Sequence, residues 1–228
     1  MMAINDRIQD IEDRIQKAKI KAGRKDDVRI LAVTKTVSRE SIKQAVDCGL
    51  RLFGENRVQE AKDKYRNRGN DTKLHMIGHL QKNKARFVPQ LFDMVQSIDS
   101  EEIALALNKE CIKQGKILPV LIQVNTSDEL SKFGVKKTQV KELTDSILTM
   151  SNLRIYGFMT IGPFTDNETQ IRKSFSLLYN IQQDMKQFYQ ELELKTLSMG
   201  MSNDFELAVQ EGANLLRIGS LIFGERKY

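Results

Sequence analysis

The stretch TLSMGMSNDFELAVQEGANLLRIGS, residues 196–220, contains the pattern that decides the fold. A short β-rich run passes through a turn of small residues into a helix-periodic segment, and a second β-rich run follows. Asn203, with Glu206 three residues later, predicts a capping box at the start of this helix. Gly212 stands where the helix would end before the next strand. The stretch therefore predicts one strand–helix–strand unit.

The same unit repeats along the whole chain. The candidate strands are 29–34, 51–54, 73–77, 94–98, 120–125, 154–160, 196–199 and 215–219. Eight strands alternating with helices predict a (β/α)₈ TIM barrel in a single domain, 1–228. An open doubly wound sheet is less favoured, because no G-x-G-x-x-G turn follows the first strand.

Helix signals fill the gaps between these strands. Ser38 and Ser100 each stand where an N-cap is needed, and acidic residues follow both of them. Isoleucines spaced three to four residues apart from Ile4 to Ile15 predict a leading amphipathic helix ahead of the barrel. A long helix is predicted over residues 166–191.

Composition excludes several protein classes. The 228 residues include 36 Lys+Arg and 30 Asp+Glu, and their net charge is +6. The basic residues are scattered among acidic ones, which argues against a nucleic-acid partner. The longest apolar run, residues 117–122, is far shorter than the roughly 20 residues of a membrane-spanning helix. Two distant cysteines and no signal core indicate a cytoplasmic protein with free thiols.

In a barrel, function is expected at the carboxyl ends of the strands. Lys35 ends the first strand, where low-dielectric walls favour a neutral amine that forms Schiff bases with aldehydes. Position alone favours a solvent-reaching lysine in a loop. The turns around Gly200 and Gly219, with the hydroxyls of Ser202 and Ser220, predict a phosphate site after strands seven and eight.

A phosphate on one side of the barrel mouth and a lysine on the other suit pyridoxal 5'-phosphate. A phosphate-sugar aldolase with a Schiff-base lysine would need the same two features. His75 and His79 lie four residues apart without an adjacent Glu and across a strand end, so we expect no metal site.

Five motifs resemble those of the pyridoxal phosphate homeostasis protein family. They are AVTKT (32–36), FGENRVQE (53–60), HMIGHLQKNK (75–84), LSMGMSND (197–204) and RIGSLIFGER (217–226). The resemblance implies the alanine-racemase-like barrel called fold type III, with pyridoxal phosphate as the cofactor. Ser220 stands where threonine is common, and this change keeps the hydroxyl.

The resemblance also implies residue roles. Lys35 would hold the cofactor as an internal aldimine, and Asn56 would lie close to its ring. Arg217 would face the pyridine nitrogen and disfavour its protonation, which weakens carbanion chemistry. The implied phosphate side is Ser198, Gly200, Met201, Ser202, Gly219 and Ser220.

Three functions compete at this point. The favoured one is a carrier that holds pyridoxal phosphate on Lys35 and releases or transfers it, with no catalytic residue and apo-enzymes as candidate recipients. The alternative is an active fold type III enzyme such as an amino-acid racemase. Such racemases add a β-rich domain that supplies a catalytic tyrosine across a dimer. We expect no such domain after Tyr228, and hence a monomer. The third function, nucleic-acid binding, is the least supported.

Overall fold

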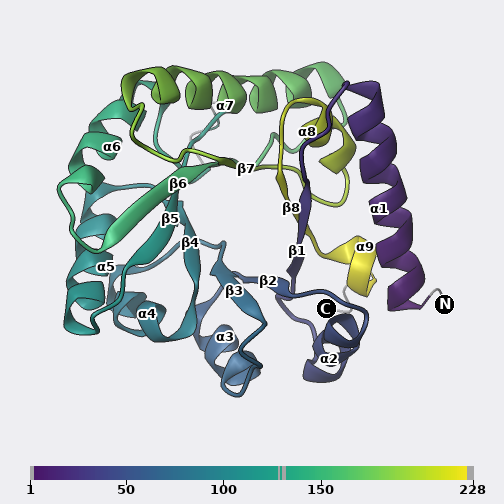
Figure 1. The fold of residues 1–228 in the computed structure, drawn as a ribbon, viewed down its shortest axis with the longest axis horizontal. Helices are drawn as coiled ribbons and strands as arrows, with labels where there is room; N and C mark the ends of the chain where they lie inside the picture. The colour runs from purple at the N-terminus through teal and green to yellow at the C-terminus, as the bar shows by residue number, and fades with distance from the viewer. Residues whose placement is uncertain (1–2, 128, 130–131, 225–228) are drawn as a thin grey trace.

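A computed structural model describes residues 3–127, 129 and 132–224 as a closed barrel of eight parallel strands. Each strand pairs with its neighbours in sequence, and β8 pairs with β1 to close the ring (Figure 1). The strands are β1 Arg29–Val33, β2 Leu52–Glu55, β3 Lys73–Met76, β4 Met94–Ile98, β5 Leu118–Gln123, β6 Leu153–Met159, β7 Thr196–Ser198 and β8 Leu215–Ile218. The predicted α/β barrel is confirmed.

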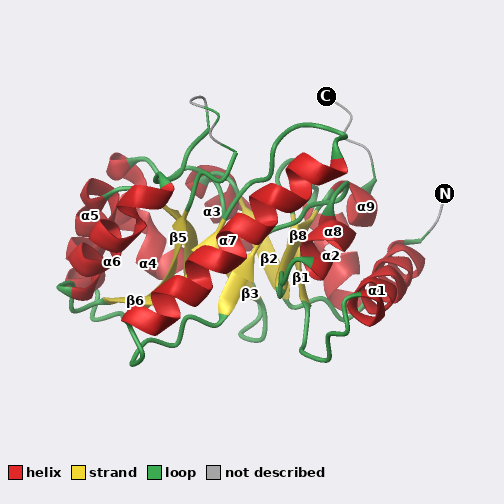
Figure 2. Cartoon of the chain, turned by 90° about the horizontal axis from the view of Figure 1, so that it is seen from above, coloured by secondary structure: helices red, strands yellow, loops and turns green. Residues whose placement is uncertain are grey.

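Helices surround the strands on the outside, as Figure 2 shows from above. The α-helices are α1 Ile4–Lys21, α2 Arg39–Asp47, α3 Val58–Tyr65, α4 Val88–Leu91, α5 Glu101–Lys113, α6 Val140–Leu148, α7 Glu168–Phe188, α8 Phe205–Gln210 and α9 Ser220–Phe223. Two 3₁₀ turns, η1 Lys82–Phe87 and η2 Lys137–Gln139, precede α4 and α6. No helix in these described ranges is both long and apolar enough to cross a membrane.

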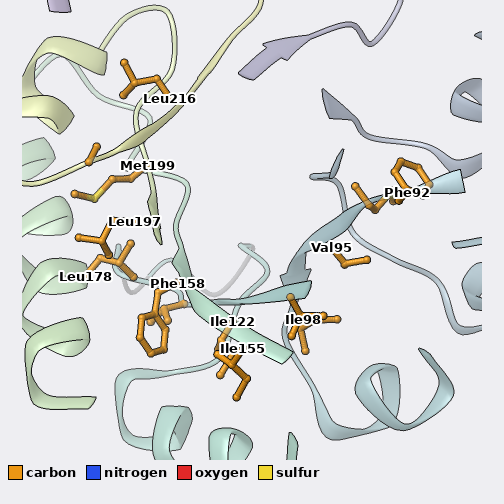
Figure 3. Packing of buried hydrophobic residues seen from close by; sticks show 14 of the residues in the cluster. Phe92, Val95, Ile98, Ile122, Ile155, Phe158, Leu178, Leu197, Met199 and Leu216 are labelled. Atoms are coloured by element: carbon orange, nitrogen blue, oxygen red, sulfur yellow. The ribbon is translucent and has the colours of Figure 1, made fainter. Parts of the chain in front are cut away.

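The main core lies between the outer faces of the strands and the inner faces of the helices (Figure 3). Phe158 of β6, Leu178 of α7 and Leu197 of β7 belong to it, and each is almost fully buried. Burying one side chain of this size contributes about 1.5–3 kcal/mol relative to leaving it exposed. This layer therefore provides most of the hydrophobic stabilisation.

The inside of the barrel has a different composition. Leu31, Val33, Ile77 and Leu215 form a small separate apolar cluster there. Barrel interiors are commonly filled by branched apolar residues. Here buried polar side chains such as Gln96, Ser198 and Arg217 share the space.

Helix α1 covers the place where the barrel closes. Its inner face buries Ile8, Ile11 and Ile15, and it lies beside α8 and α9 in Figure 1. Arg14 forms a bidentate contact with Glu206 of α8, at 3.1 and 3.2 Å. Arg7 donates to the carbonyl of Ile222 in α9 at 3.1 Å. The leading helix thus holds the two elements that follow β7 and β8.

Most predicted helix signals are confirmed. Ser38 accepts from the backbone N–H of Ser41, and Ser100 accepts from that of Ile103. The capping box at Asn203 is wrong. Helix α8 begins after Asp204, whose Oδ1 accepts from the Met201 N–H at 2.6 Å. Glu206 cannot cap the helix, because its carboxylate is turned outward to Arg14.

Most predicted boundaries differ from the structure by one to three residues. Strand β5 begins at Leu118 rather than at residue 120, so Pro119 lies within it at the second position. Proline is tolerated near the start of a strand, where a missing N–H is least costly. The long helix α7 begins after the cap Asn167 and ends at Phe188, slightly inside the predicted limits.

Candidate cofactor site

Lys35 follows β1 at the carboxyl end of the barrel and is half buried. Leu31 and Val33 point into the interior, and the N–H of Thr34 continues the ladder to the carbonyl of Gly54 at 3.0 Å. Side chains alternate along a strand, so Lys35 lies on the interior side and Thr34 on the outer side. The backbone therefore places Lys35 at the barrel mouth, the position that the sequence predicts.

The residue after Lys35 is held in a left-handed conformation. Thr36 has φ of 64°, which is uncommon for a β-branched residue and costs about 1–2 kcal/mol. Its backbone N–H donates to Glu60 Oε1 at 2.5 Å, and its hydroxyl donates to the Lys35 carbonyl at 2.6 Å. These bonds fix the direction in which the chain leaves Lys35.

A charged cluster behind β1 supports this turn. Lys64 contacts Glu60 at 2.6 Å and the buried Glu55 at 3.1 Å, and it also donates to the carbonyl of Thr34. Burial would raise the pKa of Glu60, but the hydrogen bonds from Lys64 and the Thr36 N–H outweigh it, and the pKa is lowered. For Glu55 burial prevails and raises the pKa despite Lys64.

Asn56 lies in the turn after β2, half buried. A Cβ on Gly78, after β3, would come within 2.4 Å of the Asn56 carbonyl oxygen. Glycine therefore lets the turns after β2 and β3 pack directly against each other. Within the described part of the chain, the Asn56 amide makes no hydrogen bond, and this leaves it available to a ligand.

Arg217 of β8 is buried inside the barrel, where it is 4% exposed. Its guanidinium donates to the Ser198 hydroxyl at 2.8 Å and to the Thr160 carbonyl at 2.7 Å. Burial lowers the pKa of Arg217 to about 10, with the charge of Asp204 acting in the opposite direction. The group is therefore a cation at neutral pH, and no carboxylate among the described residues lies within 4 Å of it.

Ser198 is predicted on the phosphate side, but its hydroxyl is fully buried and already engaged. It accepts from Arg217 and donates to Gln96 Oε1 at 2.6 Å. Gln96 Nε2 in turn lies 2.8 Å from His75 Nδ1. The structure thus places Ser198 beside Arg217. Sequence reasoning missed Gln96, because nothing in the pattern marks an inward-facing polar residue on a short strand.

The turns after β7 and β8 lie together, as predicted. The backbone N–H of Arg217 donates to the Gly200 carbonyl at 3.0 Å, and the N–H of Leu221 reaches Ser202 Oγ at 3.5 Å. Gly200 has φ of 90°, and a Cβ there would lie 2.5 Å from that of Ala208, so α8 needs a glycine at this point. The N–H of Met201 is occupied by Asp204.

The remaining predicted residues of this side are accessible. Ser202 and Gly219 are half buried, and Ser220 and the Met201 side chain are exposed. In the described ranges, the backbone N–H groups of Ser202 and Ser220 donate to no other residue. Glu225 and Arg226, the last two residues of the final motif, lie outside the described residues.

A second polar pair lies at the ends of β3 and β4. His79 Nδ1 is 3.4 Å from Asp99 Oδ2, and the imidazole stacks on Phe133 with centroids 4.0 Å apart. Burial raises the pKa of Asp99, while His79 lowers it. The sequence places His79 at a strand end and within the HMIGHLQKNK motif, and the one role weighed for it, as a metal ligand, is disfavoured. No group of metal-ligating side chains is found in the described part of the chain.

These features fit pyridoxal phosphate. The barrel offers a buried cation without a carboxylate partner, two adjoining turns with available donors, and a lysine on the neighbouring strand, since Arg217 pairs with Leu31 of β1. Arg217 has no direct carboxylate contact among the described residues, so it can face an acceptor atom of a bound ligand.

Comparisons with known proteins agree with this fit. The alanine racemase N-terminal domain family matches residues 7–227. A pyridoxal phosphate homeostasis protein from Aquifex aeolicus is 39% identical, over 98% of both chains. Another, from Vibrio cholerae, is 41% identical over 100% of this chain and 98% of its own.

The chain belongs to the pyridoxal phosphate homeostasis protein family. A solved structure, that of PipY of Synechococcus elongatus with PLP bound, is 30% identical and superimposes with a TM-score of 0.83, covering 97% of this chain and 100% of its own. An alanine racemase from Corynebacterium glutamicum matches at 15% identity with a TM-score of 0.69, which shows a shared fold alone.

Proposed function

We propose that this protein binds pyridoxal 5'-phosphate and serves its intracellular homeostasis, holding the cofactor covalently on Lys35 and releasing it. The observation that carries the proposal is the PLP-bound PipY structure, which matches this chain over nearly its full length. Full-length relatives named for pyridoxal phosphate homeostasis support it.

Each group of the site has a part in this proposal. When bound, the cofactor supplies an aldehyde that forms an imine with a primary amine. Lys35 presents that amine from the interior side of β1, and the Thr36 turn fixes its backbone. Ser202, Gly219 and Ser220 offer donors to the phosphate, while Asn56 offers an unengaged amide to the ring. Arg217 keeps a positive charge that disfavours protonation of the ring nitrogen.

We further propose that the protein lacks robust catalytic turnover. An unprotonated ring withdraws electrons poorly, and Arg217 favours that state. The alternative, an amino-acid racemase, has support only from a shared fold. Incubation of the loaded protein with single L-amino acids distinguishes the two functions. Racemisation at about 1 s⁻¹ or faster would establish an enzyme.

The test of cofactor binding is the absorption spectrum with and without Lys35. Added pyridoxal phosphate should give the wild-type protein a visible band that remains after gel filtration, and Lys35→Ala should lose it. Lys43→Ala removes an exposed lysine from the next helix, α2, and should keep the full band. Covalent attachment also predicts a cofactor-sized mass gain after borohydride reduction, in the wild type and in Lys43→Ala only.

Two results would contradict the proposal. The first is a wild-type protein that takes up no cofactor. The second is a Lys35→Ala variant that retains the reduced, mass-shifted adduct, since this would place the covalent bond on another lysine.

The remaining parts of the proposal concern the setting. We place the protein in the cytoplasm as one domain, 1–228, and as a monomer that passes the cofactor to apo forms of pyridoxal phosphate enzymes. Sedimentation at micromolar concentration tests the monomer. Reactivation of an apo-enzyme across a dialysis membrane, compared with mixing, separates free release from direct transfer.

A further inference from the structure

Four buried polar side chains form a continuous hydrogen-bonded chain across the barrel. Arg217 of β8, Ser198 of β7, Gln96 of β4 and His75 of β3 are each at most 6% exposed. Their successive contacts measure 2.8, 2.6 and 2.8 Å. Consecutive hydrogen bonds thus link Arg217 of β8 to side chains of β7, β4 and β3.

The donor chemistry of arginine fixes the direction of this chain. A guanidinium only donates, so Ser198 Oγ must accept from Arg217. The Ser198 hydrogen then needs an acceptor, and Gln96 Oε1 is the only other partner of Oγ among the described residues. With its oxygen committed to Ser198, Gln96 turns its amide nitrogen toward His75.

His75 completes the chain as an acceptor. Gln96 Nε2 donates to Nδ1, so the imidazole must be neutral with its proton on Nε2. Burial lowers the pKa of His75 to about 3, which agrees with a neutral ring. The reversed arrangement would turn the amide nitrogen of Gln96 toward Ser198 and leave a buried hydroxyl hydrogen without an acceptor, which is costly.

The acceptors that hold Arg217 are all uncharged. They are the Ser198 hydroxyl and the Thr160 carbonyl, so neutral groups orient the guanidinium, and the charge of Asp204 acts on it without a direct contact. A carboxylate in the place of Ser198 would orient it equally well and cancel that charge. Orientation by neutral groups keeps Arg217 positively charged where it faces the cofactor.

We propose that Gln96 and His75 are positioning residues, which act through Ser198 to orient Arg217 for the cofactor. This inference rests on the proposed function for its effect on binding. The hydrogen-bond direction itself needs no cofactor, so the two can fail separately.

The first test measures the His75 tautomer in the cofactor-free protein by ¹⁵N NMR. The wild type should show an unprotonated Nδ1 and a protonated Nε2 at pH 7. Gln96→Glu places an acceptor opposite Nδ1, so this variant should carry a proton on Nδ1. A wild-type ring protonated on Nδ1, or a Gln96→Glu ring that keeps Nδ1 unprotonated, would overturn the proposed direction.

The second test is a double-mutant cycle on pyridoxal phosphate affinity. Ser198→Ala and Gln96→Leu should each weaken binding roughly tenfold, because each releases a hydrogen bond that orients a charged group. Since Gln96 acts through Ser198, the double variant should bind no worse than about the weaker single variant. Losses that multiply to about a hundredfold would overturn the route through Ser198.

A matched control is Gln182→Leu in α7. Gln182 is also buried and donates one hydrogen bond, to the Leu194 carbonyl at 2.8 Å, but it lies outside the barrel. Its affinity should stay within about twofold of wild type, and an equal loss there would show a general packing effect. If Gln96→Leu does not fold, the tautomer in Gln96→Glu and the affinity of Ser198→Ala still decide the proposal. A wild type that binds no cofactor but shows the expected tautomer contradicts the proposed function alone.

Discussion

At the scale of single residues, the face of a strand decides what a polar side chain does. Thr34 and Lys35 are neighbours, yet Thr34 bonds outward to Glu55 at 2.7 Å and to Tyr65 at 2.8 Å, while Lys35 lies on the interior side. The outward residue anchors the strand to α3. The inward residue faces the site, and the strained Thr36 follows it before α2 begins.

His75 gives a prediction on pH. The pKa of its imidazole is lowered to about 3 by burial; Asp93 raises it, and Arg29 and Arg68 lower it. The unfolded chain takes up this proton near pH 6.5, so the folded state binds fewer protons below that value. The contribution of His75 to stability is complete above about pH 6.5 and is lost as the pH falls toward 3.

The measurement is urea unfolding between pH 6.5 and 5.0. The wild-type free energy of unfolding should fall by up to about 1.4 kcal/mol per pH unit more than that of His75→Asn. Asparagine is a suitable reference because its oxygen accepts from Gln96 and does not titrate. Parallel pH profiles for the two proteins would contradict a neutral buried His75.

At the scale of elements, α1 shows how burial within one helix sets the cost of a substitution. Ile11 is 1% exposed and Ile20 is 78% exposed, in the same helix. Ile11→Ala should lower the free energy of unfolding by about 2–4 kcal/mol, because it leaves a cavity on the buried face of α1. Ile20→Ala should change it by no more than about 0.5 kcal/mol.

Urea unfolding of the two variants at pH 7 tests this prediction. The chemical change is identical in both, so their difference reports the packing of α1 on the barrel. Equal losses would mean that the helix does not dock as described.

The elements also show what a sequence can and cannot predict. All eight strands were predicted, because short β-rich runs separated by capped helices are a local signal. The start of β5 was missed because Pro119 resembles a boundary, although the early part of a strand tolerates it. The Asn203 cap failed because α8 begins one residue later, after Asp204. In addition, Arg14 holds the Glu206 carboxylate, which a local pattern cannot show for a partner so distant in sequence.

The site residues also fall into two groups, those that the sequence can predict and those that it cannot. Lys35 and the turns after β7 and β8 follow from their places at strand ends, which the fold rule identifies. The roles of Gln96 and His75 depend on which strand face points inward and on partners across the barrel. These contacts exist only in the closed barrel, so no local sequence pattern can show them.

At the scale of the whole molecule, Gly157 permits the ring to close. The pairing of β5 with β6 shifts by one residue just before it, and Gly157 has φ of 143°. A Cβ at this position would lie 2.0 Å from the Thr196 carbonyl oxygen of β7. Bulges of this kind bend a sheet, and closed barrels need such bends.

Gly157→Ala should therefore destabilise the protein by about 3 kcal/mol or more, or prevent soluble folding. Gly115→Ala is the control, since Gly115 also has a positive φ, of 60°, but nothing lies within 4 Å of a Cβ there. Its cost should be about 1 kcal/mol, from backbone strain alone. Soluble yield and urea unfolding give the comparison, and equal costs would show that the β6–β7 contact is looser than described.

The pairing of β1 with β8 has a consequence for synthesis. Arg217 lies opposite Leu31 in that ladder, so the two sides of the site come from nearly opposite ends of the chain. At about 5–20 residues per second, a ribosome makes Lys35 on the order of ten seconds or more before Arg217. A nascent chain thus carries the amine long before the cation that faces the same ligand. Any ligand held by both residues can be retained only by a finished barrel, so its capture marks the completion of folding.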